Sequence, residues 1–316
     1  MKKRFNSLSV ILNYLGSLFI ILSGLLLLPI IVAYIFNDPI VSHKGFLISS
    51  LLSISTGLIM KKVFNKGKLN TLQATIICSL GWIFISAIGA IPFVLIIDSS
   101  YLNAYFETMS GFTTTGITMY SALDLMPRSI IFWRSIIQWI GGLGILTFFL
   151  AIISQSSGGH NLFGAESHKI QVKRPVPGMK NTIKILWIIY SIFTIFIFLN
   201  LLLTGISIFD ALNHSLTTIS TGGFSPYDAS ISHYKNIGHP HYIWIEYIII
   251  LGMFLGGTNF LIHYRILFMK QFNAIYDSIE MRYWFGFIAL FSGIIMLEVI
   301  LKSFSISFSI RNFDFW

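Results

Sequence analysis

Cysteine and charge are both scarce in this chain, and each shortage excludes a class of protein. The single cysteine, Cys78, has no partner for a disulfide within the chain, and its position inside an apolar run indicates a small buried side chain. Charged residues make up only 10% of the sequence, far below the average of soluble domains. No nucleotide-binding glycine loop, metal-ligand pair or nucleophile–base arrangement is visible, so an enzyme is not expected.

Long apolar runs, in contrast, are abundant. Hydrophobic residues make up 55% of the sequence and aromatic residues 16%, and the mean hydropathy is +0.78. A helix of about 20 apolar residues crosses the hydrocarbon layer of a membrane, so the composition predicts an all-α polytopic membrane protein. About seven transmembrane spans are expected, at Val10–Phe36, Gly45–Val63, Leu72–Ile97, Ile130–Ile153, Ile183–Leu203, Tyr242–Phe268 and Tyr283–Leu301.

The first apolar run has one feature of a signal peptide, because the basic residues of Met1–Arg4 precede it. The run is longer than the apolar region of a signal peptide, however, and no small-residue cleavage site follows Pro29. We therefore expect a retained first helix.

Lysine and arginine are distributed unevenly between the two sides of the predicted spans. Fifteen of the 21 fall at the N-terminus and in every second connection, and six fall on the opposite side. Short loops rich in Lys and Arg face the cytoplasm, so the N-terminus is predicted to be cytoplasmic. This distribution also accounts for the net charge of +9, and no nucleic-acid partner is implied.

A polar segment occurs twice, each time between two predicted spans. Tyr101–Gly116 and Ile208–Gly223 align without a gap, and each begins with a stretch too short to cross a membrane. Their polar side chains would be costly in lipid. We expect two re-entrant half-helices that enter from the outside, in parallel span–pore–span repeats. The matched pairs are Asn103 with Asp210, Ala104 with Ala211, Thr108 with Ser215, Thr114 with Thr221 and Gly116 with Gly223.

The end of each segment is suited to a cation. A half-helix directs the negative end of its dipole toward the ion, and an extended strand can replace the ion's water with carbonyl oxygens. Glycine supplies backbone angles that other residues resist. The chemistry expected is dehydration of a cation, with no bond making. The predicted filter residues are Thr113, Thr114, Thr115 and Gly116, followed by Ser220, Thr221, Gly222 and Gly223.

Several motifs, taken together, resemble one family. They are Gly111–Gly116, Phe132–Ser135 with Gln138 and Trp139, Gly141–Gly144, Ser220–Ser225 and Gly256–Phe260. With these motifs the chain resembles the Trk/Ktr/HKT potassium transporters, and within them the TrkH-type uptake subunit of bacterial cell membranes. The resemblance implies four span–pore–span repeats around one pathway, with K⁺ as the transported substrate at the filter residues and no cofactor. It also implies a cytosolic, TrkA-like nucleotide-binding regulatory subunit.

The motifs divide the chain into an N-terminal helix pair (1–70), a first repeat (71–154), a cytoplasmic loop (155–180), a second repeat (181–270) and the first span of a third (271–316). Phe308–Asp314 resembles the entry to a third pore helix, but Trp316 precedes any third filter. Two filter strands offer about half of a four-sided ring, so this chain alone is not expected to form a selective pore. Three alternatives are open: a second chain that carries the missing repeats, a remnant that no longer transports, or a homodimer.

Two other classes of membrane protein stay open as well. A sodium- or proton-coupled carrier also uses half-helices and internal repeats, although many carriers have inverted repeats and these are parallel. A non-transporting subunit or scaffold would tolerate bulky residues in place of Gly116 and Gly223.

Polar residues near the two segments are expected to support them. Glu107 and His214 occupy equivalent positions and are predicted to hold the filters from behind through hydrogen bonds. Arg134 and Gln138 lie one helical turn apart and are predicted to brace the structure.

The remaining candidates are assigned structural roles. Glycines in Gly141–Gly144 are predicted to allow close helix packing, and Gly256 with Gly257 fits either packing or a locally broken helix. Glu298, inside the last predicted span, is expected to await a partner from another helix. The uneven spacing of His233, His239 and His241 predicts no metal site.

Overall fold

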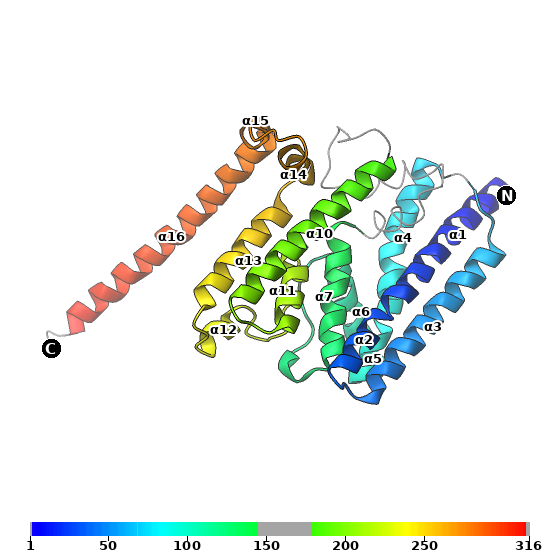
Figure 1. Ribbon diagram of the computed structural model, residues 1–316, viewed down its shortest axis with the longest axis horizontal. Helices are drawn as coiled ribbons and strands as arrows, with labels where there is room; N and C mark the ends of the chain where they lie inside the picture. Colours follow the sequence, from blue (N-terminus) through cyan, green and yellow to red (C-terminus); the bar gives the residue numbers. More distant parts are fainter. Residues whose placement is uncertain (1, 68, 145–178, 314–316) are drawn as a thin grey trace. The chain divides into compact units, whose positions relative to one another are not determined.

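A computed structural model describes residues 2–67, 69–144 and 179–313 of the chain (Figure 1). All regular elements in these ranges are helical, which confirms the predicted fold class. The chain divides into two compact units, Met1–Phe260 and Leu261–Trp316. The finer division into repeats stays a prediction.

The described helices follow one another along the chain with short connections. In the first unit they are α1 (Lys2–Leu25), α2 (Leu28–Ile35), α3 (Ile40–Val63), α4 (Thr71–Gly89), α5 (Ile91–Ile97), α6 (Tyr101–Phe112), the 3₁₀ turn η1 (Leu123–Leu125), α7 (Arg128–Gly142), α10 (Met179–Leu203), α11 (Ile208–Ile219), α12 (Ser232–Asn236) and α13 (Tyr242–Gly257). They are followed by α14 (Phe260–Leu267), α15 (Ala274–Asp277) and α16 (Ile279–Phe313).

Among the described residues, five stretches are long and apolar enough to cross a membrane, and they agree within a few residues with five of the predicted spans. The predicted span Ile130–Ile153 begins in α7, and its part beyond Gly144 lies outside the described residues. The five stretches are Ser7–Ile35, Ile40–Val63, Leu72–Ile97, Ile183–Leu203 and Ile279–Lys302.

The predicted span Tyr242–Phe268 is formed by two helices rather than one. Helix α13 ends at Gly257, Thr258 is extended, and α14 begins at Phe260. If the pair counts as one crossing, it is a sixth span. The structure therefore favours the locally broken helix over an uninterrupted span at this point.

Two of the spans are themselves interrupted where proline occurs. Pro29 lies in the first turn of α2, and Pro92 lies in the first turn of α5. Proline is tolerated there because the first N–H groups of a helix have no partner within it. Helix α4 instead begins with reciprocal hydrogen bonds, since the Asn70 side chain accepts from the Gln73 N–H at 2.8 Å and the Gln73 side chain accepts from the Asn70 N–H at 3.0 Å.

Helix α1 packs along α3 through small residues. A Cβ atom on Gly57 would lie 2.8 Å from Cγ1 of Ile20, so only glycine allows this separation. The Ser53 hydroxyl donates to the carbonyl oxygen of Phe19 at 2.7 Å, across the same contact. Small residues and serine hydroxyls are the usual means of joining helices in lipid, and they join the predicted N-terminal helix pair.

The second unit has its own small core of Ile262, Ala274 and Met281. The structure corrects the expectation for Glu298, whose carboxylate already pairs with Lys302 at 2.6 Å on the same helix. The two residues lie four apart in sequence, and both side chains are exposed on the surface of α16.

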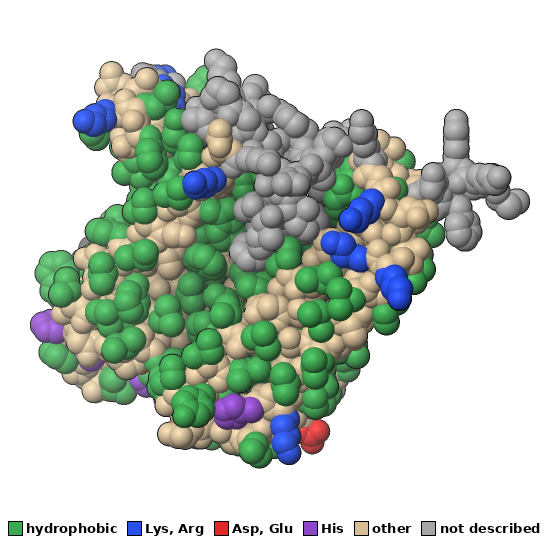
Figure 2. Space-filling model, turned by 45° about the vertical axis from the view of Figure 1, so that its right-hand side comes forward, with side chains coloured by type: hydrophobic (Ala, Val, Ile, Leu, Met, Phe, Trp, Pro, Cys, Tyr) green, Lys and Arg blue, Asp and Glu red, His purple; other side chains and the backbone are tan. Residues whose placement is uncertain are grey.

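Hydrophobic side chains cover much of the face shown in Figure 2. Leu51, Leu72, Ile195 and Leu203 are among the large apolar residues whose side chains are exposed. Soluble monomers rarely expose contiguous apolar surface on this scale. Together with the apolar spans, this surface marks a membrane-embedded protein.

Candidate cation filter

Two short helices of identical length, α6 and α11, carry the predicted filter segments. Each has twelve residues, which is too few to cross a membrane. A serine precedes each helix, and its hydroxyl accepts a hydrogen bond from the backbone N–H three residues further on. The distances are 3.4 Å from Asn103 to Ser100 and 3.0 Å from Asp210 to Ser207.

Both helices also end in the same cap. The threonines two residues after the helices, Thr114 and Thr221, have φ angles of +54° and +58°. The N–H of Thr115 reaches the Ser110 carbonyl at 2.9 Å, and the N–H of Gly222 reaches the Thr217 carbonyl at 3.0 Å. This is the Schellman arrangement, in which glycine usually takes the left-handed position. A β-branched residue there costs about 1–2 kcal/mol, and such strain often marks functional sites.

The two predicted segments lie against each other at their glycines. Gly116 and Gly223 have φ angles of +77° and +80°, which favour glycine. A Cβ atom on Gly116 would also overlap the carbonyl oxygen of Gly222, so the first segment touches the second.

The side chains of the two segments differ in how far they are exposed. Thr113, Thr115 and Thr221 are exposed, and the hydroxyls of Thr113 and Thr115 lie 2.8 Å apart. Ser220, in contrast, is fully buried and donates to the carbonyl oxygen of Thr217 at 2.9 Å. Ser220 therefore caps its own helix. The exposed Thr113 and Thr221 also bond to backbone, since their hydroxyls donate to the carbonyl oxygens of Met109 and Ser220, each at 2.7 Å.

A buried ion pair stands behind the first segment. Nε of Arg134 lies 2.7 Å from Oε1 of Glu107, and the two side chains are 1% and 0% exposed. Glu107 also accepts from the Thr118 hydroxyl at 2.9 Å and from the Met119 N–H at 2.8 Å. Arg134 also contacts the second predicted repeat, because it donates to the Ser225 carbonyl at 2.9 Å. The predicted supporting role of Glu107 and the predicted bracing role of Arg134 agree with these contacts.

Gln138, one helical turn after Arg134, also contacts the second predicted segment. Its Oε1 accepts from the Phe224 N–H at 3.0 Å, and a Cβ atom on Gly222 would lie 2.5 Å from its Cδ. Its Nε2 is buried without a hydrogen-bond partner in the described part of the chain. Gln138 therefore sits between the two filter segments and fixes the position of the second.

The support behind the second segment is different, and the expectation for His214 is wrong in one respect. His214 is buried, and its Nε2 has no hydrogen-bond partner among the described residues. Its ring packs instead on Tyr234, with centroids 5.7 Å apart. Near the start of the same helix, Asp210 accepts from the Tyr227 hydroxyl at 2.9 Å. Burial, with the nearby Asp210 carboxylate, raises the pKa of Tyr227 to about 12, so the phenol stays protonated and donates.

The segments that follow the two filters are also joined. Asp228 accepts from the backbone N–H of Ala122 at 2.7 Å and from that of Leu123 at 3.1 Å. The position of α7 is fixed by Asp38, which accepts from the Ser129 N–H at 2.8 Å at the start of that helix. Carboxylates at such sites satisfy N–H groups that a helix leaves free.

Glycines of α7 and α13 meet the C-terminal ends of α6 and α11. A Cβ atom on Gly141 would overlap the carbonyl oxygen of Phe112, and one on Gly256 would overlap that of Ile219. These contacts support the packing role predicted for Gly141. They assign the same role to Gly256, directly before the break at Thr258.

Sequence reasoning did not find the Arg134–Glu107 pair, nor the roles of Asp38 and Asp228. One signal was available for the pair: an arginine and a glutamate in neighbouring apolar segments are expected to neutralise each other. Asp38 and Asp228 carried no such signal, because they contact backbone about 90 and 105 residues away in sequence. His233, His239 and His241 pack on neighbouring aromatic rings, and His233 stacks on Tyr227 at 3.6 Å.

The helices and the exposed apolar surface together define a polytopic helical membrane protein, in which a short helix with the same C-terminal cap occurs twice. Residues 42–294 match the sequence profile of the TrkH family, described as cation transport proteins. The chain belongs to this family.

Individual relatives agree with this assignment. The chain is 37% identical over 268 residues to an uncharacterized cation transporter of Methanocaldococcus jannaschii, covering 84% of this chain and 54% of the relative. It is 31% identical over 282 residues to the Trk system potassium uptake protein TrkH of Escherichia coli K12, covering 87% and 57%. The chain therefore spans about half the length of the curated relatives it matches.

A solved structure shows the same fold. The crystal structure of the potassium transporter TrkH from Vibrio parahaemolyticus superposes with a TM-score of 0.75 at 27% identity. The superposition covers 90% of this chain and 57% of that one.

Proposed function

We propose that this chain contributes two quarters of the filter of a potassium uptake system, with Thr113–Gly116 and Ser220–Gly223 as its filter strands. The observation that carries the proposal is the identical backbone of the two segments: a capped twelve-residue helix, a threonine at positive φ and a glycine at positive φ two residues later. A sequence that only connected two spans would have no reason to adopt this strained conformation twice.

The local electrostatics support a cation rather than an anion. Both short helices end at the filter segments, so the negative ends of their dipoles point there. Arg134, the one buried Lys or Arg side chain near the segments among the described residues, is neutralised by Glu107 and held behind them. Carbonyl oxygens and threonine hydroxyls are thus the groups left to replace the water of a potassium ion.

The proposal includes an orientation and partners. We place the N-terminus in the cytoplasm, so that both filter strands are reached from outside. A cytosolic TrkA-like nucleotide-binding subunit would dock on the cytoplasmic side, where residues 155–178 of the loop 155–180 lie outside the described residues. The remaining filter strands of the system would lie outside residues 1–316.

Potassium uptake tests the proposal. Cells without potassium importers would express this chain, first alone and then with the reading frame encoded directly downstream. Growth on low potassium only with the pair would support a transporter assembled from two chains, and growth with this chain alone would support a homodimer.

Variants of the filter glycines make the test specific. Gly116→Asp and Gly223→Asp should abolish uptake in any competent assembly. Gly238→Asp is the matched control, because Gly238 also has a positive φ of +70° and free space around it but lies in an outer loop. Unchanged uptake in both filter variants would refute the filter assignment.

A further inference from the structure

Helix α7 receives its N-terminal cap from a distant part of the chain. Pro127 precedes the helix and has no side-chain acceptor, so the first N–H groups need partners elsewhere. The partner is Asp38, 90 residues before Arg128. Its Oδ1 accepts from the Arg128 N–H at 3.1 Å, and its Oδ2 accepts from the Ser129 N–H at 2.8 Å and from the Ser129 hydroxyl at 2.6 Å. The cap of α7 thus belongs to the predicted N-terminal helix pair.

The connection that carries Asp38 is itself fixed. The Asp38 N–H donates to the carbonyl oxygen of Ala33 in α2 at 2.9 Å. Pro39 follows, with the restricted φ of proline, and α3 begins at the next residue. Helix α2 also packs on both α3 and α7. The carboxylate is therefore presented to α7 by a segment with little conformational freedom.

The same connection contacts the second predicted repeat. The ring of Phe36, at the end of α2, meets the ring of Phe209 near the start of α11, with centroids 5.0 Å apart. The Arg128 guanidinium lies over the Phe209 ring as well, with Cζ 5.1 Å from the centroid. Such edge and cation contacts stabilise aromatic rings in a defined geometry. The end of α2 therefore contacts the start of both α7 and α11.

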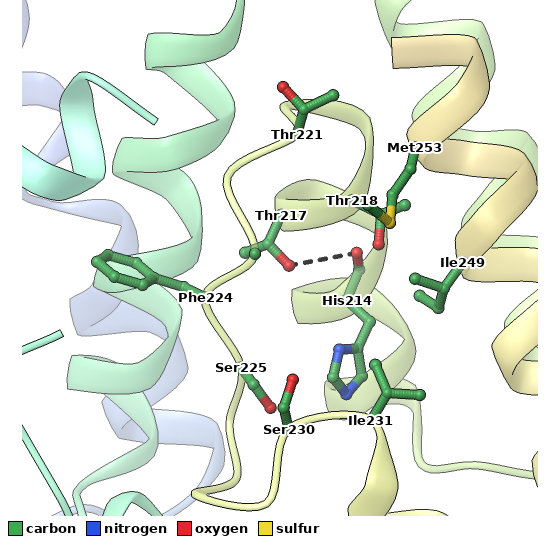
Figure 3. A pocket seen from close by; sticks show the side chains of 11 residues that line it. His214, Thr217, Thr218, Thr221, Phe224, Ser225, Ser230, Ile231, Ile249 and Met253 are labelled. Carbon is green, nitrogen blue, oxygen red and sulfur yellow. Dashed lines mark hydrogen bonds between the residues drawn. The ribbon is translucent and has the colours of Figure 1, made fainter. Parts of the chain in front are cut away.

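From its capped end, α7 carries the side chains that hold both proposed filter segments. Arg134 donates to the Thr118 hydroxyl, after the first segment, at 3.2 Å and to the Ser225 carbonyl, after the second, at 2.9 Å. Gln138 accepts from the Phe224 N–H at 3.0 Å. In Figure 3 Phe224 points away from the other labelled side chains, and its ring lies 4.3 Å from Cζ of Arg134. One helix therefore contacts the chain after each segment.

The contacts between α7 and its neighbours leave little free space. Most side chains of α7 are buried, so the helix is expected to move as a unit. Ile137 fills the space beside Gly111 of α6, and Gln138 is equally close to the second segment. At the corresponding contact of the second predicted repeat the large residue is on the other partner, where Gly252 of α13 meets the methyl group of Thr218. A displacement of α7 would therefore be transmitted to both segments.

Helix α13 is the counterpart of α7 in the second predicted repeat, but it is built differently. Gly256 of α13 meets the last carbonyl of α11, as Gly141 meets that of α6. Two turns earlier on each helix, Ile249 takes the place of Arg134. His241, before α13, forms no side-chain cap hydrogen bond within the described part of the chain. The distant cap and the charged brace thus occur together on α7.

We propose that Asp38 and Phe36 are positioning residues for both proposed filter segments. Resting on the proposed function, this inference gives the predicted N-terminal helix pair a role in ion selectivity. Asp38 fixes the start of α7, and Phe36 fixes the start of α11. Through Arg134 and Gln138, α7 then holds the chain that follows each segment.

The first measurement is hydrogen–deuterium exchange of the purified chain in detergent, which requires no transport. Asp38→Ala should accelerate exchange about tenfold at the start of α7 and also in peptides that contain Phe224. Asp38→Asn keeps one acceptor oxygen and should be intermediate, and it keeps the test decisive if Asp38→Ala does not fold. Asp98→Asn is the matched control, because Asp98 is an exposed carboxylate in another helix connection, and it should change neither rate.

Two outcomes of this measurement would overturn the proposal. Faster exchange confined to the start of α7 would make Asp38 a local cap only. Equal acceleration throughout the described helices would show a general loss of stability rather than a link to the segments.

The second measurement is the preference for potassium over sodium, by competition in an assembly that takes up potassium. Asp38→Asn and Phe36→Ala should lower this preference at an unchanged amount of protein in the membrane, and Asp98→Asn should keep it. Slower uptake with an unchanged preference would show a merely structural role and overturn the proposal. If exchange at Phe224 responds to Asp38→Asn while both filter-glycine variants keep normal uptake, only the proposed function is refuted.

Discussion

Arg134 is the residue on which the two repeats depend most directly. It pairs with Glu107 behind the first proposed filter segment and donates to the Ser225 carbonyl beyond the second. Arg134→Ala would leave the Glu107 carboxylate buried without its cation, which costs about 3–5 kcal/mol. We therefore expect a large fall in the melting temperature of the purified protein.

Two comparisons identify the source of that loss. The double variant Glu107→Gln/Arg134→Met removes both charges and should be less destabilised than Arg134→Ala alone. Lys44→Ala removes an exposed cation and should change the melting temperature little. If the double variant were less stable than Arg134→Ala, the ion pair itself would be a net source of stability.

At the scale of the element, the caps of α6 and α11 combine a regular geometry with an unfavourable residue. Thr221→Gly removes the strain of a β-branched residue in the left-handed conformation, which stabilises the fold by about 1–2 kcal/mol. Glycine also makes the unfolded chain more flexible, which destabilises the fold by about 0.5–1 kcal/mol. We expect a melting temperature that is unchanged or slightly higher. Preference for potassium over sodium, measured by competition in uptake, should fall, because the filter strand loses its restricted conformation.

Ala122→Gly is the matched control for this prediction. Ala122 also has a positive φ, of +56°, but lies in the segment that follows the first filter. The control should gain stability in the same way and keep its ion preference. Equal loss of preference in both variants would show that the filter threonine has no special role.

Elements differ in how far the sequence predicts them. The spans follow from hydropathy alone, because about 20 apolar residues leave a helix little alternative in lipid. The two filter segments were found because Tyr101–Gly116 and Ile208–Gly223 share a pattern. The positive φ of Thr114 and Thr221 was not predictable, since β-branched residues avoid that conformation unless the surrounding structure imposes it.

The supporting residues show a second limit. The sequence placed Glu107 and His214 at equivalent positions, which suggests equivalent roles. The structure gives the first an arginine partner and leaves Nε2 of the second without a hydrogen-bond partner among the described residues. The difference depends on Arg134 and Ile249, whose correspondence becomes visible only through the contacts of Gly141 and Gly256 with the pore helices.

At the scale of the whole molecule, the distribution of Lys and Arg predicts the orientation in the membrane. In a Cys78→Ser background, Lys235→Cys in the segment after the second filter should react with a membrane-impermeant maleimide added to intact cells. Lys66→Cys should react only after permeabilisation. Both lysines are exposed in the structure, so a difference in labelling reports the side of the membrane. The reverse pattern would invert the proposed topology.

The exchange of small and large residues between the repeats has a consequence for how such proteins diverge. Ile137 beside Gly111 and Gly252 beside Thr218 place the bulk on opposite partners of the same contact. A duplicated unit can therefore change its sequence at this contact only by compensated steps, in which one partner gains volume as the other loses it. Sequence identity between the two units then falls at both positions, while the distance between their helices is kept. Common descent is therefore easier to recognise from the combined volume of the two contacting side chains than from either residue alone.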